Sequence, residues 1–195
     1  MDSGAAQNYQ ALIDAPYQFD FYDGGGLDIA FLSFAEVDAK GNVNISRFGD
    51  KIVGVGGFIN ISQNARKAVF SGTFTAGGLE TAFEGGRLRI VREGRHRKFV
   101  GSIEQICYNA TFAAEQGRTA LFVTERALFR ATIAGLELIE IAPGIDIERD
   151  ILAHMDFKPA VAARLKLMDA RLFTPQLMGL ANDKTHENIR QGLRA

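Results

Sequence analysis

Three glycine clusters set between short apolar runs constrain this chain more than any other feature. They lie within residues 23–78, at Gly24–Gly26, at Gly54 with Gly56 and Gly57, and at Gly77–Gly78. The apolar runs between them are typical of buried strands. Glycine beside a strand lets a ligand approach bare backbone, where free N–H groups can bind an anion. No strong nucleophile or base stands in a recognisable setting near these loops, so the region resembles half of an active site.

Length and composition set broad limits. A chain of 195 residues forms one domain, or one domain with an appendage. Its 47% hydrophobic content and 15 phenylalanines supply a core, and the net charge of −1 gives no general attraction to nucleic acid or anionic membranes. The single Cys107 excludes an internal disulfide and a multi-cysteine metal site.

Nothing in the sequence indicates export or a membrane span. No apolar run approaches the length of a membrane-spanning helix. The first ten residues lack the charged and apolar regions of a secretory signal. We therefore expect a cytoplasmic protein. The abrupt start at Met1, with no evident first strand or helix cap, favours a piece of a longer chain.

Apolar runs predict a sheet with few long helices. Strands are expected at 28–37, 67–72, 119–124, 127–132 and 136–141, the first of them covered on both faces. Residues 87–100 predict an exposed β-hairpin with its turn at Glu93–Gly94. Asp146 is placed to cap a helix that buries one face. The pattern indicates an α/β or α+β fold, an open mixed sheet flanked by helices.

The aromatic residues before the first glycine cluster have two interpretations. Tyr17, Phe19, Phe21 and Tyr22 could wall a pocket, or they could pack in the core, which is the favoured reading. Glu125–Arg126 after a strand fits a cleft lining and a local ion pair equally well.

The turn at residues 54–60 does not match the common nucleotide-binding motifs. A dinucleotide fingerprint needs glycine at its sixth position, where this chain has Ile59, and no P-loop lysine follows. A tight turn of this kind can donate N–H groups to a developing oxyanion. By its shape alone, an ordinary strand-to-helix turn is the favoured reading.

Several long segments resemble the C-terminal, beta-type part of family I CoA-transferases, in particular the single-chain acetoacetate/acetate type. They run in order from about Tyr17 to Phe173: YQFDFYDGGGLDIAFLSFAEVDAKGNVNISRFG, VGVGGFINISQNARKAVFSGTFTAGG, FVTERALF, EIAPGIDIERDI and LKLMDARLF. The resemblance implies a CoA-transferase-like lobe over residues 1–173. Residues 174–195 are then a polar C-terminal tail.

The resemblance also implies a chemistry and a set of site residues. CoA passes between short-chain acyl-CoA and carboxylates such as acetate or acetoacetate, in ketone-body or short-chain fatty acid metabolism, through a glutamyl-CoA intermediate. The family's oxyanion-hole glycines fall on Gly56 and Gly57. Gly54, Asn60, Gly77 and Gly78 are expected to contact the substrate. Coenzyme A is a substrate, and no tightly bound cofactor or metal is implied.

One departure from the family pattern concerns the nucleophile. The family's catalytic glutamate precedes the triple-glycine region by some tens of residues, and this chain has no counterpart of it. Asp2-Ser3-Gly4 is a coincidental likeness, with aspartate in place of glutamate. We therefore expect the glutamate on a missing N-terminal lobe or an alpha-type subunit, in a homo-oligomeric enzyme.

Two other function classes remain as alternatives. The first is a non-catalytic module that binds acyl-CoA or pairs with another subunit. The second is a nucleic-acid binder that uses the basic residues 87–98, which the balanced charge and the lack of stacking aromatics disfavour. Three scattered histidines make a metal site improbable, and Cys107 is most simply a small buried apolar residue.

Overall fold

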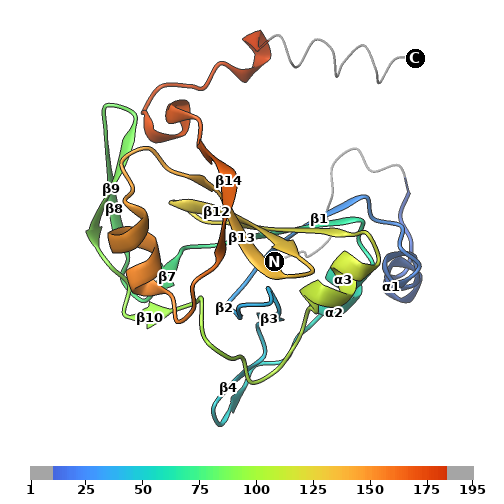
Figure 1. Cartoon of the computed structure of the whole chain (residues 1–195). Coiled ribbons are helices and arrows are strands. Elements are labelled where there is room, and N and C mark those ends of the chain that lie inside the picture. Colours follow the sequence, from blue (N-terminus) through green and yellow to red (C-terminus); the bar gives the residue numbers. More distant parts are fainter. Residues whose placement is uncertain (1–10, 184–195) are drawn as a thin grey trace.

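A six-stranded mixed sheet forms the centre of the structure, a computed structural model that describes residues 11–183 (Figure 1). Its spatial order is β1-β6-β11-β12-β13-β14. β1, β6 and β11 are parallel and form one half of the sheet. In the other half, β12 is antiparallel to both β11 and β13, and β14 is parallel to β13. The predicted α/β class with an open mixed sheet is confirmed. The strands are β1 (Ile29–Ser33), β6 (Lys67–Ser71), β11 (Thr119–Val123), β12 (Ala127–Thr132), β13 (Gly135–Ile141) and β14 (Ala160–Leu167).

Aromatic packing holds the parallel half of the sheet to the helix α2 (Phe58–Gln63). Phe70 of β6 and Phe122 of β11 are fully buried register neighbours whose ring centroids lie 5.2 Å apart. Phe70 also contacts Phe58 at 5.7 Å and Tyr108 at 4.9 Å between ring centroids. Helix α3 (Ala110–Glu115) packs near β11 and β12. The core therefore fixes where the turn before α2 lies.

The remaining helices are short. They are α1 (Ala15–Asp23), the π-helical turn η1 (Ile147–Ile151) and the 3₁₀ turns η2 (Leu152–His154), η3 (Ala170–Phe173) and η4 (Leu180–Asn182). The expected cap is confirmed, because the Asp146 side chain accepts a hydrogen bond from the Arg149 N–H at 2.8 Å. Within residues 11–183 no helix has both the length and the apolar character needed to cross a membrane.

Four small strand pairs surround the sheet, and one of them is the predicted exposed hairpin in a different place. It spans residues 80–92, not 87–100. Gly85 and Gly86 have φ of 57° and 74°, the left-handed conformation that a two-residue hairpin turn requires. The pairs are β2 (Glu36–Val37) with β3 (Val43–Asn44), β4 (Arg47–Phe48) with β5 (Lys51–Ile52), β7 (Thr75–Ala76) with β10 (His96–Arg97), and β8 (Glu80–Glu84) with β9 (Arg87–Arg92).

Strand β1 and helix α1 contradict two expectations about burial. β1 is an edge strand whose outer face is open, with Phe31 69% exposed. Helix α1 has no buried residue, and Tyr17 and Phe21 are 65% and 53% exposed. Both predictions assumed a second covering layer, and residues 11–183 supply none over these side chains.

The C-terminal part of the chain contains a strand that the sequence analysis did not predict, and it includes the predicted domain boundary at residue 173. β14 was not predicted, because its alternating charged residues leave only a weak apolar signal. Arg171 donates hydrogen bonds to two residues beyond position 173, to the carbonyl of Met178 and to the carboxylate of Asp183. Residues 184–195 of the predicted tail lie outside the described residues, so the domain boundary at 173 stays a prediction.

A fully buried arginine links three segments that are distant in sequence. Both terminal nitrogens of Arg126 bond the carboxylate of Glu93, which follows β9. One of them also donates to the Asp150 carbonyl of η1 at 2.9 Å, and Nε donates to Glu125 at 2.6 Å. Its guanidinium lies 4.8 Å from the ring centre of Phe74. Of the two open readings of Glu125–Arg126, the structure therefore contains the ion pair.

The charge state of Glu93 depends on this arginine. Burial raises the pKa of Glu93, but hydrogen bonds from Arg126 and Thr75 outweigh burial and hold it below its ordinary value. A lowered carboxyl pKa stabilises the fold above the pKa of the unfolded chain. That contribution is lost as the pH falls through the lowered value.

We expect Arg126→Ala to lower the free energy of unfolding by about 3–5 kcal/mol, because it leaves two partly buried carboxylates, Glu93 and Glu125, without their cation. Arg130→Ala is the matched control: it removes a half-exposed ion pair with Glu137 and should cost less than about 1 kcal/mol. Urea unfolding followed by circular dichroism measures both. Equal effects for the two variants would contradict the central place of Arg126.

The exposed apolar side chains of β1 and α1 lead to a second prediction, that the chain self-associates through them. Exposed apolar side chains of this kind promote self-association and binding of hydrophobic dyes when they gather on one surface. Phe31→Ser should reduce dye binding and sedimentation-detected association without loss of stability. Ile133→Ser, equally exposed at 69% but on the turn between β12 and β13, is the control and should leave both unchanged. A monomeric wild-type chain without dye binding would show that this face needs no partner.

Candidate functional site

The predicted oxyanion turn leads into helix α2. Gly54 and Gly56 have φ of 86° and 51°, a conformation that favours glycine. The N–H groups of Phe58 and Ile61 bond back to carbonyls of this same turn. Among the described residues, neither the Gly56 nor the Gly57 N–H has an acceptor. Two neighbouring amides are therefore free to bind an anion or a developing oxyanion.

The two glycines of the turn are needed for different reasons. A Cβ on Gly57 would lie 2.9 Å from the ring of Phe19, so helix α1 packs directly against the backbone there. A Cβ on Gly56 would meet nothing within 4 Å, and only its positive φ disfavours a side chain. Gly56 thus presents the open side of the turn, and Gly57 the side held by α1.

Asn60 joins this turn to the first glycine cluster. Its side-chain nitrogen donates to both carboxylate oxygens of Asp23, at 3.1 and 3.0 Å. Asn64 donates to the Asp23 carbonyl at 2.8 Å. Since Gly24 follows Asp23, α2 fixes the start of the triple glycine. The sequence analysis missed this link, which the pairing of an aspartate with two asparagines one helical turn apart could have suggested.

Gly77 and Gly78, predicted as part of the same site, lie elsewhere. They follow β7, which Figure 1 shows on the opposite side of the molecule from α2. With Arg92, Glu93 and Arg95 they line a pocket of about 330 Å³. Nε of Arg92 donates to the Gly78 carbonyl at 3.0 Å. The described chain therefore places the predicted residues in two groups: Gly54, Gly56, Gly57 and Asn60 beside α1, and Gly77–Gly78 beside the hairpin.

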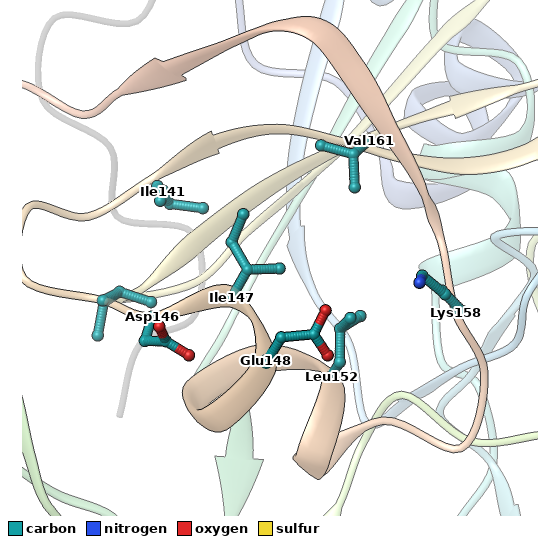
Figure 2. Close-up of a pocket in the computed structure, with 8 residues that line it drawn as sticks. Ile141, Asp146, Ile147, Glu148, Leu152, Lys158 and Val161 are labelled. Carbon is teal, nitrogen blue, oxygen red and sulfur yellow. The ribbon is translucent and has the colours of Figure 1, made fainter.

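A third group of residues lines a pocket that contains none of the predicted residues. It has a volume of about 520 Å³ and lies at the β14 edge of the sheet, away from β1 and α2. Figure 2 shows the apolar side chains of Ile141, Ile147 and Val161 near one another, with Glu148 and Lys158 at its border. Its lining is completed by Ile145, Asp146 and Leu152.

The remaining candidate residues have structural surroundings. Cys107 is buried and its Sγ lies 3.3 Å from Oγ of Ser46, as expected for a small core residue. His154 Nε2 lies 3.5 Å from Glu93. Within residues 11–183, no three histidine, cysteine or acidic side chains are grouped closely enough to hold a metal ion. His186 lies outside the described residues.

The sequence has strong relatives among characterised proteins, although it matches no protein-family model. Acetate CoA-transferase YdiF of Escherichia coli K12 is 51% identical over 176 residues, which are 90% of this chain and 33% of the relative. Caffeate CoA-transferase of Acetobacterium woodii is 46% identical over 182 residues, 91% of this chain and 34% of the relative. This chain is homologous to the family I CoA-transferases.

The solved CoA-transferase structures agree with the fold. The acyl-CoA transferase YdiF of E. coli O157:H7, in a thioester complex with CoA, superposes with a TM-score of 0.85 at 50% identity. That match covers 88% of this chain and 34% of YdiF. The decarboxylase AibA/AibB, at a TM-score of 0.62 and 21% identity, shares the fold alone. The chain spans about one third of the length of the CoA-transferases that it matches.

Proposed function

We propose that this chain is the C-terminal, beta-type lobe of a CoA-transferase that moves CoA between a short-chain acyl-CoA and a carboxylate. The observation that carries the proposal is the pair of free amides at Gly56 and Gly57, in a chain that is about half identical to acetate and caffeate CoA-transferases. The nucleophilic glutamate lies outside these 195 residues. Acetate and acetoacetate are the proposed acceptors, and the proposed enzyme is a cytoplasmic homo-oligomer.

The proposed reaction proceeds by nucleophilic catalysis. The glutamate carboxylate attacks the acyl-CoA carbonyl, a C–O bond forms, the C–S bond breaks and CoA leaves as a thiolate. The thiolate then attacks the glutamyl carbonyl of the resulting anhydride and releases the first carboxylate, leaving a glutamyl-CoA thioester. The second carboxylate reverses these two steps and departs as the new acyl-CoA. Each attack places negative charge on a carbonyl oxygen, which positioned N–H donors stabilise.

In this scheme the turn before α2 serves as the oxyanion hole. Its geometry is set before substrate arrives, because Phe58 is anchored against Phe70 and Gly57 is held against Phe19. Asn60 supports the turn through Asp23 and leaves its carbonyl oxygen for a substrate group. Gly54 is exposed at the entrance of the turn, and Gly77–Gly78 would contact a distant part of CoA, beside Arg92 and Arg95.

We expect the 195-residue chain alone to show no CoA transfer between acetoacetyl-CoA and acetate, because it has no counterpart of the nucleophilic glutamate. The enzyme assembled with the glutamate-bearing lobe should turn over at an ordinary rate of about 1–10³ s⁻¹. Steady-state thioester assays measure both. Normal turnover by the chain alone would place a nucleophile within it.

The oxyanion role is tested in the assembled enzyme. Gly56→Val or Gly57→Val should lower kcat by about 10²–10³, since the new side chain blocks the approach to one N–H donor or displaces it. Gly49→Val is the matched control for Gly56, because Gly49 also has a positive φ of 58° and open space around its Cβ position. It imposes the same backbone strain in the β4–β5 turn and should leave kcat unchanged. If all three variants behave alike, the assignment of the hole to this turn is wrong.

A second candidate is a non-catalytic subunit-pairing module, favoured by the exposed aromatic side chains of α1 and β1. It predicts that the chain binds a partner lobe without changing its turnover. The assembly experiment separates the two functions, because a catalytic lobe restores activity to a partner that is inactive by itself.

A further inference from the structure

A buried lysine lies at the carboxyl ends of three parallel strands. Lys98 is 7% exposed, and its Nζ lies 3.8 Å from the ring centre of Phe34, the residue that follows β1. A Cβ on Gly72, the residue that follows β6, would lie 2.7 Å from the same Nζ. In open α/β sheets, ligands bind in the crevice outside the carboxyl ends of such strands.

The ammonium of Lys98 has no close anionic partner in the described chain. The acidic residue that acts on it is Glu125, two residues after the end of β11. Both carboxylate oxygens of Glu125 are already engaged, one by Arg126 Nε at 2.6 Å and one by the Phe74 N–H at 2.9 Å. Within residues 11–183 no carboxylate oxygen lies within 4.0 Å of Nζ, and no acceptor receives a hydrogen bond from it. A buried cation without a partner is costly and is typical of a binding site.

The surroundings lower the affinity of this lysine for its proton. Burial lowers the pKa of Lys98 to about 8, against a smaller opposing effect of Glu125. An anion bound to the ammonium would reverse this effect and favour the charged form. Below about pH 8 the charged form of Lys98 predominates, and this is the form that binds an anion.

We propose that Lys98 binds a carboxylate at this edge of the sheet. One ammonium matches one negative charge, whereas a phosphate with a charge near −2 would be repelled by Glu125. The buried ring of Phe34 makes the surroundings of the ammonium apolar, which suits a carboxylate that carries a short alkyl chain. The choice of a short-chain carboxylate rests on the proposed function, in which such a molecule is the acceptor.

The test is an NMR titration of the chain with ¹³C- and ¹⁵N-labelled lysine. One lysine should titrate near pH 8, and its signal should be absent in Lys98→Met. Saturating acetate or butyrate should raise that pKa toward the ordinary 10.5, while chloride at equal ionic strength should not. Carboxylate binding should be tighter at pH 7 than at pH 9.5. No shift with any carboxylate would overturn the inference.

Two further variants keep the result interpretable. Gly72→Ala retains the lysine but puts a methyl group 2.7 Å from the position of Nζ, so the ammonium must move, and carboxylate binding should weaken by about tenfold or more. Lys67→Met removes an exposed lysine at the opposite end of β6 and should leave binding unchanged. Equal binding by wild type and both Lys98→Met and Gly72→Ala would also overturn the inference.

The assembled enzyme distinguishes the two sources of a carboxylate. If acetate raises the Lys98 pKa there, the ligand is the free substrate. If that pKa is already near 10.5 without substrate and acetate leaves it there, a protein carboxylate from outside the described residues is bound to Lys98. Failure of the proposed function is a separate result, since it is read from CoA turnover and not from lysine titration.

Discussion

The buried guanidinium of Arg126 is the interaction on which the arrangement of the molecule depends. It bonds to Glu93 after β9, to Glu125 in the turn between β11 and β12, and to the Asp150 carbonyl of η1. In the described chain, no strand pairing joins these three segments to one another. A planar donor with five N–H groups can satisfy several acceptors at once, which a lysine could not do in the same space. The end of the hairpin and the turn η1 are thereby held to the turn between β11 and β12.

The parallel half of the sheet lies next to both groups that could bind a substrate, the Lys98 ammonium and the amides of Gly56 and Gly57. β1, β6 and β11 run side by side, and the residues that follow them surround the ammonium of Lys98. The free amides of Gly56 and Gly57 precede α2, which packs on the same aromatic core through Phe58. Rigid, buried elements therefore carry the exposed backbone groups, an arrangement that limits the reorganisation needed on substrate binding.

On one side of this half, apolar side chains are not covered by any part of the described chain. The outer face of β1 and nearly all of α1 expose aromatic and aliphatic side chains, although α1 also packs against the Gly57 backbone. A lobe that completes a CoA-transferase would be expected to meet the chain near its glycine turns. The exposed Tyr17 and Phe21 lie on the helix that leads into the triple glycine, so contact there would act directly on the candidate site.

The sequence by itself predicted five of the six strands of the central sheet, the fold class and the resemblance to CoA-transferases. Apolar runs such as 67–72 and 119–124 coincide with β6 and β11, and the cap at Asp146 is local enough to be read from neighbouring residues. The tight glycine turn at Gly54 and Gly56 was also predicted, because its conformation is set by the backbone of a single turn, and both residues have a positive φ.

Only the tertiary structure decided which of these elements meet. It separated Gly77–Gly78 from the turn before α2, and it left β1 and α1 uncovered. It also brought Lys98 to Phe34 and Gly72. Contacts between residues so distant in sequence depend on strand order and on how the whole core packs, and neither periodicity nor motif spacing carries that information.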